Sequence, residues 1–236
     1  MEQEIPLVSI VTVTYNAERD IAACISSVKQ QSYPNIEHII IDGGSTDNTI
    51  ETIKNSNVAH WISEPDQGIY DAMNKSIPFI KGKWVLFLGA DDILLPDFSK
   101  LCWHLKHKDH IYYAQSQFNH KLLGRAFDAY RLAKFNICHQ SILYPRRVFD
   151  FYTYNIRYKI RADHDLNIRC FADPRFTFEY HALVISKFAD GGFSSTFEDA
   201  NFFNDRDELI KSQLGWWVYL KFKMRRLRHR IKGRKS

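Results

Sequence analysis

Residues Leu7–Thr14 read LVSIVTVT, an almost unbroken run of apolar and β-branched residues near the start of the chain. Such a run is typical of a strand that is covered on both faces. Ile36–Ile41, Ala59–Ser63 and Trp84–Leu88 are three further strand candidates, and the stretches between them carry apolar residues at helical spacing. Strands that alternate with helices predict an α/β fold with a mostly parallel, Rossmann-like sheet flanked by helices. The first helix is expected to begin at Asn16, whose side chain can cap it.

The second half of the chain is less regular. It contains a strand candidate at Ser141–Tyr144, a helix candidate at Asp163–Ala172 and one or two strands within Phe176–Phe188. Glu198–Leu214 has a helical pattern and leads into a basic C-terminal end. These patterns divide a single domain into residues 1–113 and 114–212, with residues 213–236 as an appended tail that is expected to form a basic amphipathic helix.

Charge is distributed unevenly along the chain. From Lys221 to the end there are nine basic residues and no acidic one. This segment therefore carries more positive charge than the net +5 of the whole chain, so the remainder is mildly acidic. The four cysteines are far apart, which favours reduced thiols over a zinc site. No apolar run approaches the roughly 18–20 residues of a membrane-spanning helix. Residues 1–6 lack the basic start of a signal peptide, so a cytoplasmic protein is expected.

Polar residues cluster just after the predicted strands. Tyr15-Asn16 follows the first strand, Asp42 the second, Asp66 the third and Asp91-Asp92 the fourth. In open parallel sheets, ligands bind outside the carboxyl ends of the strands. We therefore expect these residues to share one ligand site.

The pair Asp91-Asp92 suggests a metal. Mg²⁺ and Mn²⁺ prefer hard oxygen ligands, usually one or two carboxylates plus substrate phosphates. Two adjacent acids also raise each other's pKa unless a cation lies between them. Taken alone, the pair could equally be a solvated turn or a helix cap before Ile93–Asp97.

Four sequence blocks resemble the opening half of the inverting family 2 glycosyltransferases, in the branch that builds bacterial O-antigen and other surface polysaccharides. They are LVSIVTVTYN at 7–16, DGGSTDNT at 42–49, EPDQGIYDAMN at 64–74 and FLGADD at 87–92, in the family's order and with its spacing. The resemblance implies a GT-A fold in which residues 1–113 bind a nucleotide sugar and residues 114–212 bind the acceptor. It also implies a metal-dependent enzyme that moves one hexosyl or N-acetylhexosaminyl group from a UDP donor to a saccharide acceptor, with Mn²⁺ or Mg²⁺ as cofactor.

Within these blocks the resemblance assigns contacts with the donor and its metal. Asp92 would bind the metal, and Ala90 stands where the family has the first acid of its D-x-D element. Asp66 could instead be a turn residue beside Pro65 and Gly68. The expected donor contacts are Val13 and Tyr15 around the base, Asp42 on the base, Asp91 on the ribose and Asp66 toward the donor.

Residues 162–169 read ADHDLNIR and resemble the family's E-D-x-x-x-x-x-R element. The resemblance puts Asp163 at the position of the catalytic base, with Ala162 in place of the glutamate. A carboxylate at the start of a helix, near the acceptor, suits proton removal. Asp165 is the alternative base, and either acid could instead cap the helix.

Two further segments match the same branch. His139-Gln140 would bind the acceptor sugar, or could be a polar pair at the start of a strand. Gly192-Phe193-Ser194 would form a loop near the donor phosphates. The Q-x-x-R-W signature of processive synthases is absent, which favours addition of a single sugar.

Trp217, Leu220, Met224, Leu227 and Ile231 recur at alternating spacings of three and four residues in the tail. An apolar stripe flanked by arginine and lysine favours an amphipathic helix that lies on an anionic membrane through residues 216–236. The protein would then be peripheral on the inner face of the plasma membrane, where a lipid-linked acceptor is available. A homodimer or coiled-coil contact, packing on the domain and a nucleic-acid patch are the alternatives, although nucleic acid is not expected as a partner.

Two other functions fit parts of the sequence. A sugar-phosphate nucleotidyltransferase also uses an α/β sheet and a metal, but it usually has a glycine-rich basic loop where this chain has Thr14-Tyr15-Asn16. A catalytically inactive module that binds a nucleotide sugar or a membrane surface would account for the missing glutamate at position 162.

Overall fold

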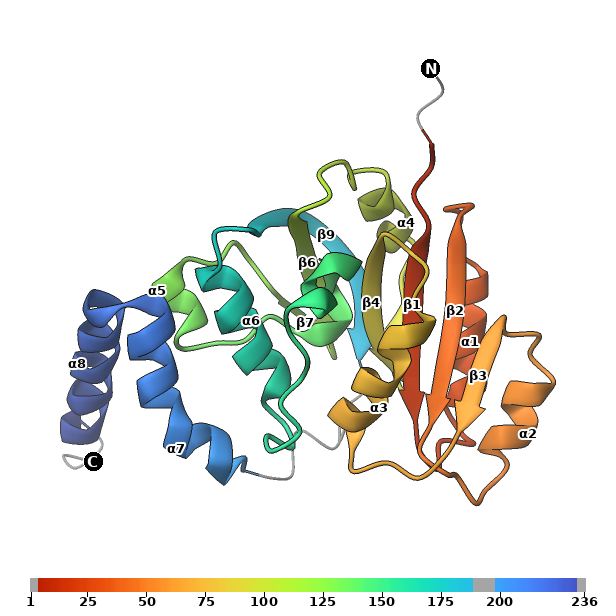
Figure 1. Cartoon of the computed structure of the whole chain (residues 1–236), viewed down its shortest axis with the longest axis horizontal. Coiled ribbons are helices and arrows are strands. Elements are labelled where there is room, and N and C mark those ends of the chain that lie inside the picture. The colour runs from red at the N-terminus through yellow and green to blue at the C-terminus, as the bar shows by residue number, and fades with distance from the viewer. Residues whose placement is uncertain (1–3, 189–197, 233–236) are drawn as a thin grey trace.

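The computed structural model describes residues 4–188 and 198–232 (Figure 1). The first half of the chain forms the parallel part of one sheet. β1 (Val8–Thr14) lies between β2 (Ile36–Asp42) and β4 (Trp84–Gly89), and β3 (His60–Ser63) pairs with β2, all in parallel. Every residue of β1 and β4 is buried, as expected for strands covered on both faces. The predicted α/β fold, with a mostly parallel sheet flanked by helices, is confirmed.

Helices cover both faces of this parallel region. α3 (Ile69–Ser76) packs in the same apolar cluster as Val11 of β1. α1 (Ile21–Lys29) and α4 (Asp97–Cys102) share a second cluster with Ile10, on the opposite face. Neighbouring residues of a strand point to opposite faces, which explains why Ile10 and Val11 lie in different clusters.

Asn16 does not cap α1, contrary to expectation. The helix begins at Ile21 without a capping side chain. Asn16 has a φ of 47°, its amide donates to Ser45 Oγ at 2.8 Å, and its Oδ1 accepts from the Thr46 amide at 2.9 Å. The loop after β1 is thereby tied to the loop that precedes α2 (Thr49–Lys54).

The second half of the chain continues the same sheet. β8 (Ile142–Pro145) pairs antiparallel with both β4 and β6 (His110–Phe118), and β9 (Thr177–Phe188) pairs in parallel with β6. β6 has no counterpart among the predicted strands, because its apolar residues give way to the polar run QSQ within the strand. β6 crosses the boundary between residues 113 and 114, so the two halves share one sheet. The short strands β5 (Ile93–Leu94) and β7 (Lys121–Leu123) pair with β9 and β6.

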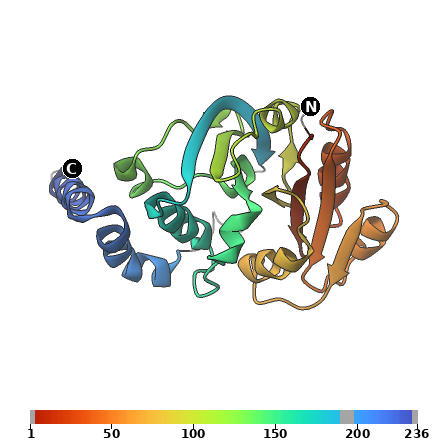
Figure 2. The same cartoon turned by 45° about the horizontal axis from the view of Figure 1, so that its top comes forward.

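The chain folds back on itself near its C-terminal end. The helix expected over Glu198–Leu214 is present as α7 (Ala200–Leu209) and a π-helical turn (Ile210–Leu214). Gly215, with a φ of 88°, separates them from α8 (Trp216–Lys232). Figures 1 and 2 show α7 and α8 side by side, at the end of the molecule farthest from β3. The other helices of the described residues are α5 (Ala129–Leu132) and α6 (Ala162–Ala172), and the 3₁₀ turns described there are Ile77–Phe79, His139–Ser141 and Arg146–Asp150.

Within residues 4–188 and 198–232, no helix is long and apolar enough to cross a membrane.

Candidate active site

The carboxyl ends of β1 and β2 meet at one edge of the sheet, the lower edge in Figure 1. The Gly43 amide donates to the Thr14 carbonyl at 2.8 Å, which joins the loops that leave the two strands. Val13, the last residue but one of β1, is buried, and Tyr15, just beyond the strand, has 63% of its surface exposed. Tyr15 is therefore available to a ligand at this edge, whereas Val13 can act only from beneath it.

The Asp42 carboxylate is enclosed by its own surroundings. Asp42 has no exposed surface, and its Oδ2 accepts hydrogen bonds from the Gly44 amide at 3.0 Å, the Ser45 amide at 2.8 Å and Ser63 Oγ at 2.6 Å. Ser45 Oγ donates to the other oxygen, Oδ1, at 2.5 Å. These bonds fix the turn after β2. They also fill the hydrogen-bond acceptor positions of the carboxylate with donors from the protein itself.

Asp66 lies directly over the same turn. Its Oδ1 accepts from the Gly68 amide at 2.8 Å. A Cβ placed on Gly43 would lie 2.4 Å from Asp66 Oδ2 and 3.4 Å from Tyr15 Cδ2. The absence of a side chain at Gly43 therefore permits Asp66 and Tyr15 to converge on one spot at the sheet edge.

The acid pair follows β4 in a tight turn. Asp91 is exposed, whereas Asp92 is 4% exposed and its Oδ2 accepts from the Gly89 amide at 2.9 Å. A Cβ on Gly89 would lie 2.8 Å from Asp91 Oδ1 and 2.9 Å from Asp92 Oδ2, so both carboxylates gather over this glycine. Burial raises the pKa of Asp92 to about 7, with His139 opposing this shift and Asp91 adding to it.

The two carboxylates fit a divalent cation of the hard, oxygen-binding class. Mg²⁺ and Mn²⁺ are commonly held by one or two protein carboxylates together with substrate phosphates. In the described part of the chain, no group of three or more histidine, cysteine or acidic side chains is arranged to hold a metal ion by itself. A cation bound at Asp91 and Asp92 would take its remaining ligands from a phosphorylated molecule or from water.

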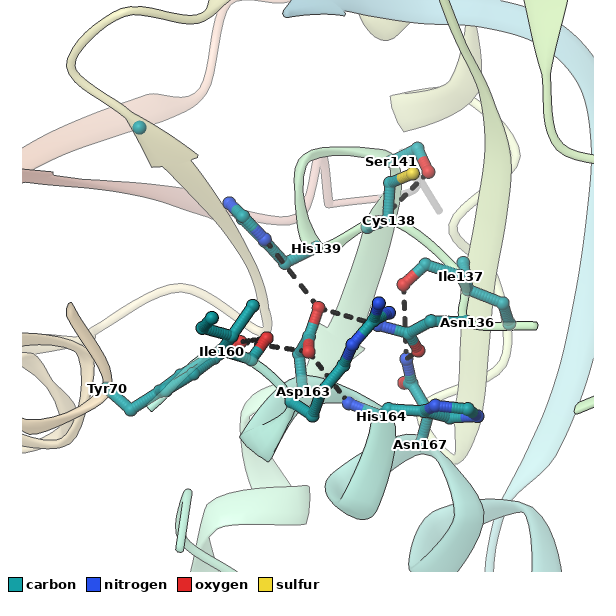
Figure 3. A network of polar contacts seen from close by, with 12 residues as sticks. Tyr70, Asn136, Ile137, Cys138, His139, Ser141, Ile160, Asp163, His164 and Asn167 are labelled. Atoms are coloured by element: carbon teal, nitrogen blue, oxygen red, sulfur yellow. Dashed lines mark hydrogen bonds and ion pairs between the residues drawn. The ribbon is translucent and has the colours of Figure 1, made fainter. Parts of the chain in front are cut away.

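Asp163 lies in the first turn of α6 and is 5% exposed. Its Oδ1 accepts from the His164 amide at 2.8 Å and lies 2.9 Å from the Tyr70 hydroxyl. Asn136 Nδ2 donates to Oδ2 at 2.7 Å, and His139 Nδ1 lies 3.7 Å from the same oxygen. Figure 3 shows these side chains pointing toward the carboxylate from different segments of the chain.

These contacts set the charge states of Asp163 and His139. Burial by itself raises the pKa of Asp163, but His139 and Tyr70 outweigh it and hold that pKa below its ordinary value. Burial likewise lowers the pKa of His139, but the carboxylates of Asp163, Asp92 and Asp91 outweigh it and that pKa is raised. Asp163 is therefore an ionised carboxylate at neutral pH, the form that can accept a proton.

His139 connects the two groups of acids. It begins a 3₁₀ turn, its side chain is 19% exposed, and its Nε2 is buried without a hydrogen-bond partner in the part of the chain that the structure describes. The sequence assigned His139 and Gln140 to the acceptor. The structure brings His139 against Asp163, while Gln140 is 6% exposed.

Asp165, the alternative base, is engaged elsewhere. Its Oδ2 lies 2.7 Å from Arg169 Nη2 and accepts from Arg169 Nε at 2.9 Å, one turn further along α6. Arg169 also donates to the Thr153 carbonyl at 2.9 Å. Asp165 is therefore paired with Arg169, whereas Asp163 is the carboxylate beside His139.

Two residues that hold Asp163 were missing from the sequence assignments. Tyr70 belongs to the block EPDQGIYDAMN but looks like an apolar residue of its helix. Asn136 lies in an irregular loop. The Nδ2 of Asn167, on α6, donates to Asn136 Oδ1 at 2.9 Å. The only sequence signal for Tyr70 was that the block EPDQGIYDAMN extends over it. No pattern in the sequence marked Asn136. The segment Gly192-Phe193-Ser194 lies outside the described residues.

The sequence was compared with protein-family models and with curated proteins, and both comparisons found glycosyltransferases. The family model described as Glycosyl transferase family 2 matches residues 9–167. A protein of Mycobacterium tuberculosis, strain H37Ra, named PGL/p-HBAD biosynthesis glycosyltransferase, is 37% identical over 212 residues, which are 84% of this chain and 82% of the relative. The chondroitin synthase of Pasteurella multocida is 39% identical over 102 residues, 42% of this chain and 11% of that protein.

Solved structures share the fold at low sequence identity. Residues 1–349 of S. aureus TarS, in complex with UDP-GlcNAc, superpose with a TM-score of 0.70 at 16% identity, over 88% of this chain and 66% of that one. The mannosyltransferase PcManGT of Pyrobaculum calidifontis, in complex with GDP-Man and Mn²⁺, gives a TM-score of 0.63 at 15% identity, over 80% of this chain and 59% of that one. These similarities identify the GT-A arrangement of the sheet and helices.

Proposed function

The chain belongs to glycosyl transferase family 2 and is a glycosyltransferase, and on that premise we propose that it is a metal-dependent, inverting enzyme. It transfers one hexosyl or N-acetylhexosaminyl group from a nucleotide diphosphate, UDP, to a saccharide acceptor. The acceptor is carried on a lipid and belongs to the synthesis of a bacterial surface polysaccharide such as O-antigen. The cation is Mn²⁺ or Mg²⁺.

The position of His139 carries this proposal. Its Nδ1 lies 3.7 Å from Asp163, and although burial lowers its pKa, the carboxylates of Asp163 and the acid pair together raise it. The 3₁₀ turn that begins at His139 packs against β4, so the imidazole next to Asp163 also lies near the end of the strand that the acid pair follows. A group that can hold a diphosphate and a group that can accept a proton thus lie in one site, as a transfer between two substrates requires.

Asp163 acts as the general base of a single displacement. Its ionised carboxylate takes the proton of the acceptor hydroxyl while that oxygen forms a bond to the anomeric carbon of the donor. The bond from the anomeric carbon to the diphosphate oxygen breaks, and the diphosphate leaves with the electron pair. Attack on the face opposite the leaving group inverts the anomeric configuration, and no bond between sugar and enzyme is formed.

Asp92 would hold the leaving diphosphate through a divalent cation. A divalent cation bound there would offset the negative charge that develops on the departing diphosphate. Asp91, which is exposed, would contact the ribose, and Asp92, which is buried, would bind the cation.

UDP is the carrier that the family resemblance favours. TarS, which shares the fold, has been crystallised with UDP-GlcNAc, whereas PcManGT has been crystallised with GDP-Man. GDP is therefore the nucleotide against which UDP must be compared.

Product analysis tests this function. Purified protein with Mn²⁺, a panel of UDP-sugars and a lipid-linked or soluble saccharide acceptor should give one added sugar whose anomeric configuration, read by NMR, is opposite to that of the donor. Chelation of the metal and Asp92→Ala should both stop transfer, and Mn²⁺ should restore only the wild type. A product with retained configuration, or full activity in the chelated enzyme, would disprove the mechanism.

We further propose that α8 holds the enzyme on an anionic membrane. Its inner face packs on the domain, where Phe222 is 4% exposed and shares a cluster with Ala133 and Ile210. Its outer face carries four apolar side chains that are 43–86% exposed, namely Trp217, Leu220, Met224 and Leu227. Ile231, the fifth member of the predicted stripe, lies beyond the described side chains. Two opposite apolar faces explain how the helix can be attached to the domain and still offer an apolar surface.

Basic residues border the outer face. Lys221 and Arg225 are exposed, and Lys223 and Arg226 pair with Asp207 of α7 at 2.5 and 3.3 Å. An exposed apolar strip with flanking positive charge is the pattern that binds anionic lipid surfaces, where each basic residue contributes about 1 kcal/mol.

Vesicle flotation tests the membrane proposal. Replacement of the four outer side chains of α8 by serine should abolish flotation with anionic vesicles and leave activity on a soluble acceptor intact. Leu122→Ser is the matched control, because Leu122 is 58% exposed on β7. Unchanged flotation of the fourfold variant would contradict the proposal. A monomer–dimer shift in that variant, measured by light scattering, would instead assign the face to a homodimer.

A further inference from the structure

α8 carries basic residues on two flanks, and the two flanks differ in their partners. On the side of α7, Lys223 and Arg226 pair with Asp207 at 2.5 and 3.3 Å. On the side of α5, Lys221 is exposed and forms no ion pair among the described residues, and its Nζ lies 4.3 Å from the centroid of the Tyr130 ring. Positive charge is therefore compensated on the first flank and uncompensated on the second.

α5 adds positive charge at the same place. Lys134, which follows this helix, has its Nζ 3.8 Å from the centroid of the same Tyr130 ring. The guanidinium carbon of Arg131 lies 5.0 and 5.4 Å from the ring centroids of Phe127 and Phe135. Its Nε is buried without a hydrogen-bond partner in the part of the chain that the structure describes. Aromatic rings rather than carboxylates therefore contact these cations.

Arg125, Arg131, Lys134 and Lys221 together form what we call the α5–α8 basic cluster. Burial and the charge of Arg125 lower the pKa of Arg131. Asp128 opposes this shift, but its Oδ1 is used as the cap of α5, where it accepts from the Arg131 amide at 2.6 Å. Like charges gathered in this way repel one another unless an anion lies between them. The cluster therefore has the composition of an anion site.

The position of α5 relates this cluster to the candidate base. Figures 1 and 2 show α5 between α8 and α6, and it packs against both. The Leu132 carbonyl accepts from His164 Nε2 at 2.7 Å, and Asn136 donates to Asp163 at 2.7 Å. Because Asn136 is two residues beyond Lys134, their Cα atoms are at most about 7 Å apart. The cluster is thus joined to the surroundings of the base on one side and to α8 on the other.

Resting on the function proposed above, we infer that the α5–α8 basic cluster binds the diphosphate that joins the acceptor saccharide to its lipid. A diphosphate offers more than one negative charge and several acceptor oxygens to these four cations, whereas a phospholipid phosphodiester offers a single charge. The parts of such an acceptor also follow the order of the protein. Its saccharide would lie at Asp163, its diphosphate at the cluster and its lipid along the exposed apolar side chains of α8.

Vesicle binding tests the inference without donor, metal or transfer. Phosphatidylcholine vesicles that contain a polyprenyl diphosphate are compared with vesicles that contain phosphatidylglycerol, adjusted to the same surface charge. The wild type should bind the diphosphate vesicles at least about tenfold more tightly, the effect of one hydrogen bond to a charged group. The double variant Lys134→Gln with Lys221→Gln should bind both kinds of vesicle alike, because it lacks two of the charges that hold the diphosphate.

Two further variants serve as controls. Lys223→Gln with Arg226→Gln removes the same amount of charge from the flank of α8 that faces α7, and it should keep the preference for diphosphate. Lys134→Arg with Lys221→Arg should also keep it, because a guanidinium group binds phosphate as well. Circular dichroism verifies that all three double variants are folded.

Each outcome decides the matter. A wild type without preference would assign the cluster to phospholipid headgroups, and the inference would fail. It would also fail if the glutamine variant at 134 and 221 kept the preference, or if either control variant lost it, since overall charge or packing on Tyr130 would then be responsible. These failures leave the proposed function standing. A wild type that prefers the diphosphate vesicles but transfers no sugar in the product analysis would disprove the function and leave the diphosphate site in place.

Discussion

The two halves of the molecule hold their carboxylates in different ways. Asp42, in the first half, receives all four of its hydrogen bonds from residues of neighbouring loops at the end of β2 and β3. Asp163, in the second half, is held by Tyr70, Asn136 and His139, which come from three separate segments. The first arrangement is local and shapes a turn. The second depends on the whole fold, and it leaves an ionised, buried carboxylate next to His139, whose pKa the acid pair of the first half also raises.

The strongest test of this contrast compares the two acids of α6. Asp163→Asn should lower kcat by about 10²- to 10⁴-fold, the range expected for a lost general base, with little change in folding. Asp165→Asn should retain most activity but lose about 1–3 kcal/mol of stability, because Arg169 loses its buried partner. Steady-state kinetics and thermal unfolding measure the two effects. An inactive Asp165→Asn with an active Asp163→Asn would reverse the assignment.

Replacement of His139 should have a smaller effect and a distinct pH signature. His139 helps to hold the pKa of Asp163 below its ordinary value, against burial, which raises it. In His139→Gln the pKa of Asp163 should therefore rise, and the acid limb of the kcat/KM profile should move to higher pH, with kcat reduced about tenfold. A lower kcat with an unmoved acid limb would limit His139 to acceptor binding, as the sequence suggested.

Metal binding to the acid pair should depend on pH. Because burial raises the pKa of Asp92 to about 7, this carboxyl is mostly protonated at about pH 6 and mostly ionised at about pH 8. A cation prefers the ionised form, so Mn²⁺ should raise the melting temperature more at the higher pH. Asp92→Asn should lose this dependence. Equal shifts at both pH values in the wild type would rule out Asp92 as the titrating ligand.

The smallest effect is expected at Tyr70. Tyr70→Phe removes the hydroxyl that lies 2.9 Å from Asp163 and should cost about 1 kcal/mol of stability with a several-fold loss of kcat. Tyr33→Phe is the control, because its hydroxyl donates to the Pro6 carbonyl at 2.7 Å, away from the site. Similar losses of kcat in both variants would show that Tyr70 acts only through stability.

The parallel strands and the acid pair could be predicted from the sequence because their signals are local. β1 and β4 are continuous apolar runs, and Asp91-Asp92 directly follows one of them. β6 could not be predicted in this way, since its polar run at residues 115–117 is held in the strand by pairing with β9, which lies far along the chain. Asn16 was misjudged for a related reason: its side chain bonds to a distant loop at Thr46 rather than to its own helix.

The candidate base shows the same limit. The pattern around Asp163 marked the residue, but its ionised state depends on His139 and Tyr70, whose approach is a property of the folded chain. No spacing in the sequence relates Tyr70 or Asn136 to Asp163, because each reaches it through tertiary packing. The enclosure of Asp42 was equally hidden, since three of its four donors come from a turn whose shape the sequence leaves open.

The central claim is that the first half holds the donor and the second half removes the proton. UDP binding with Mn²⁺, measured by calorimetry alongside transfer in the same preparations, tests it most directly in Asp163→Asn and Asp92→Ala. Asp163→Asn should bind UDP with wild-type affinity while its transfer falls by about 10²- to 10⁴-fold, whereas Asp92→Ala should lose the effect of Mn²⁺ on both. A loss of UDP affinity in Asp163→Asn that parallels its loss of transfer, or transfer by that variant at close to the wild-type rate, would contradict the claim.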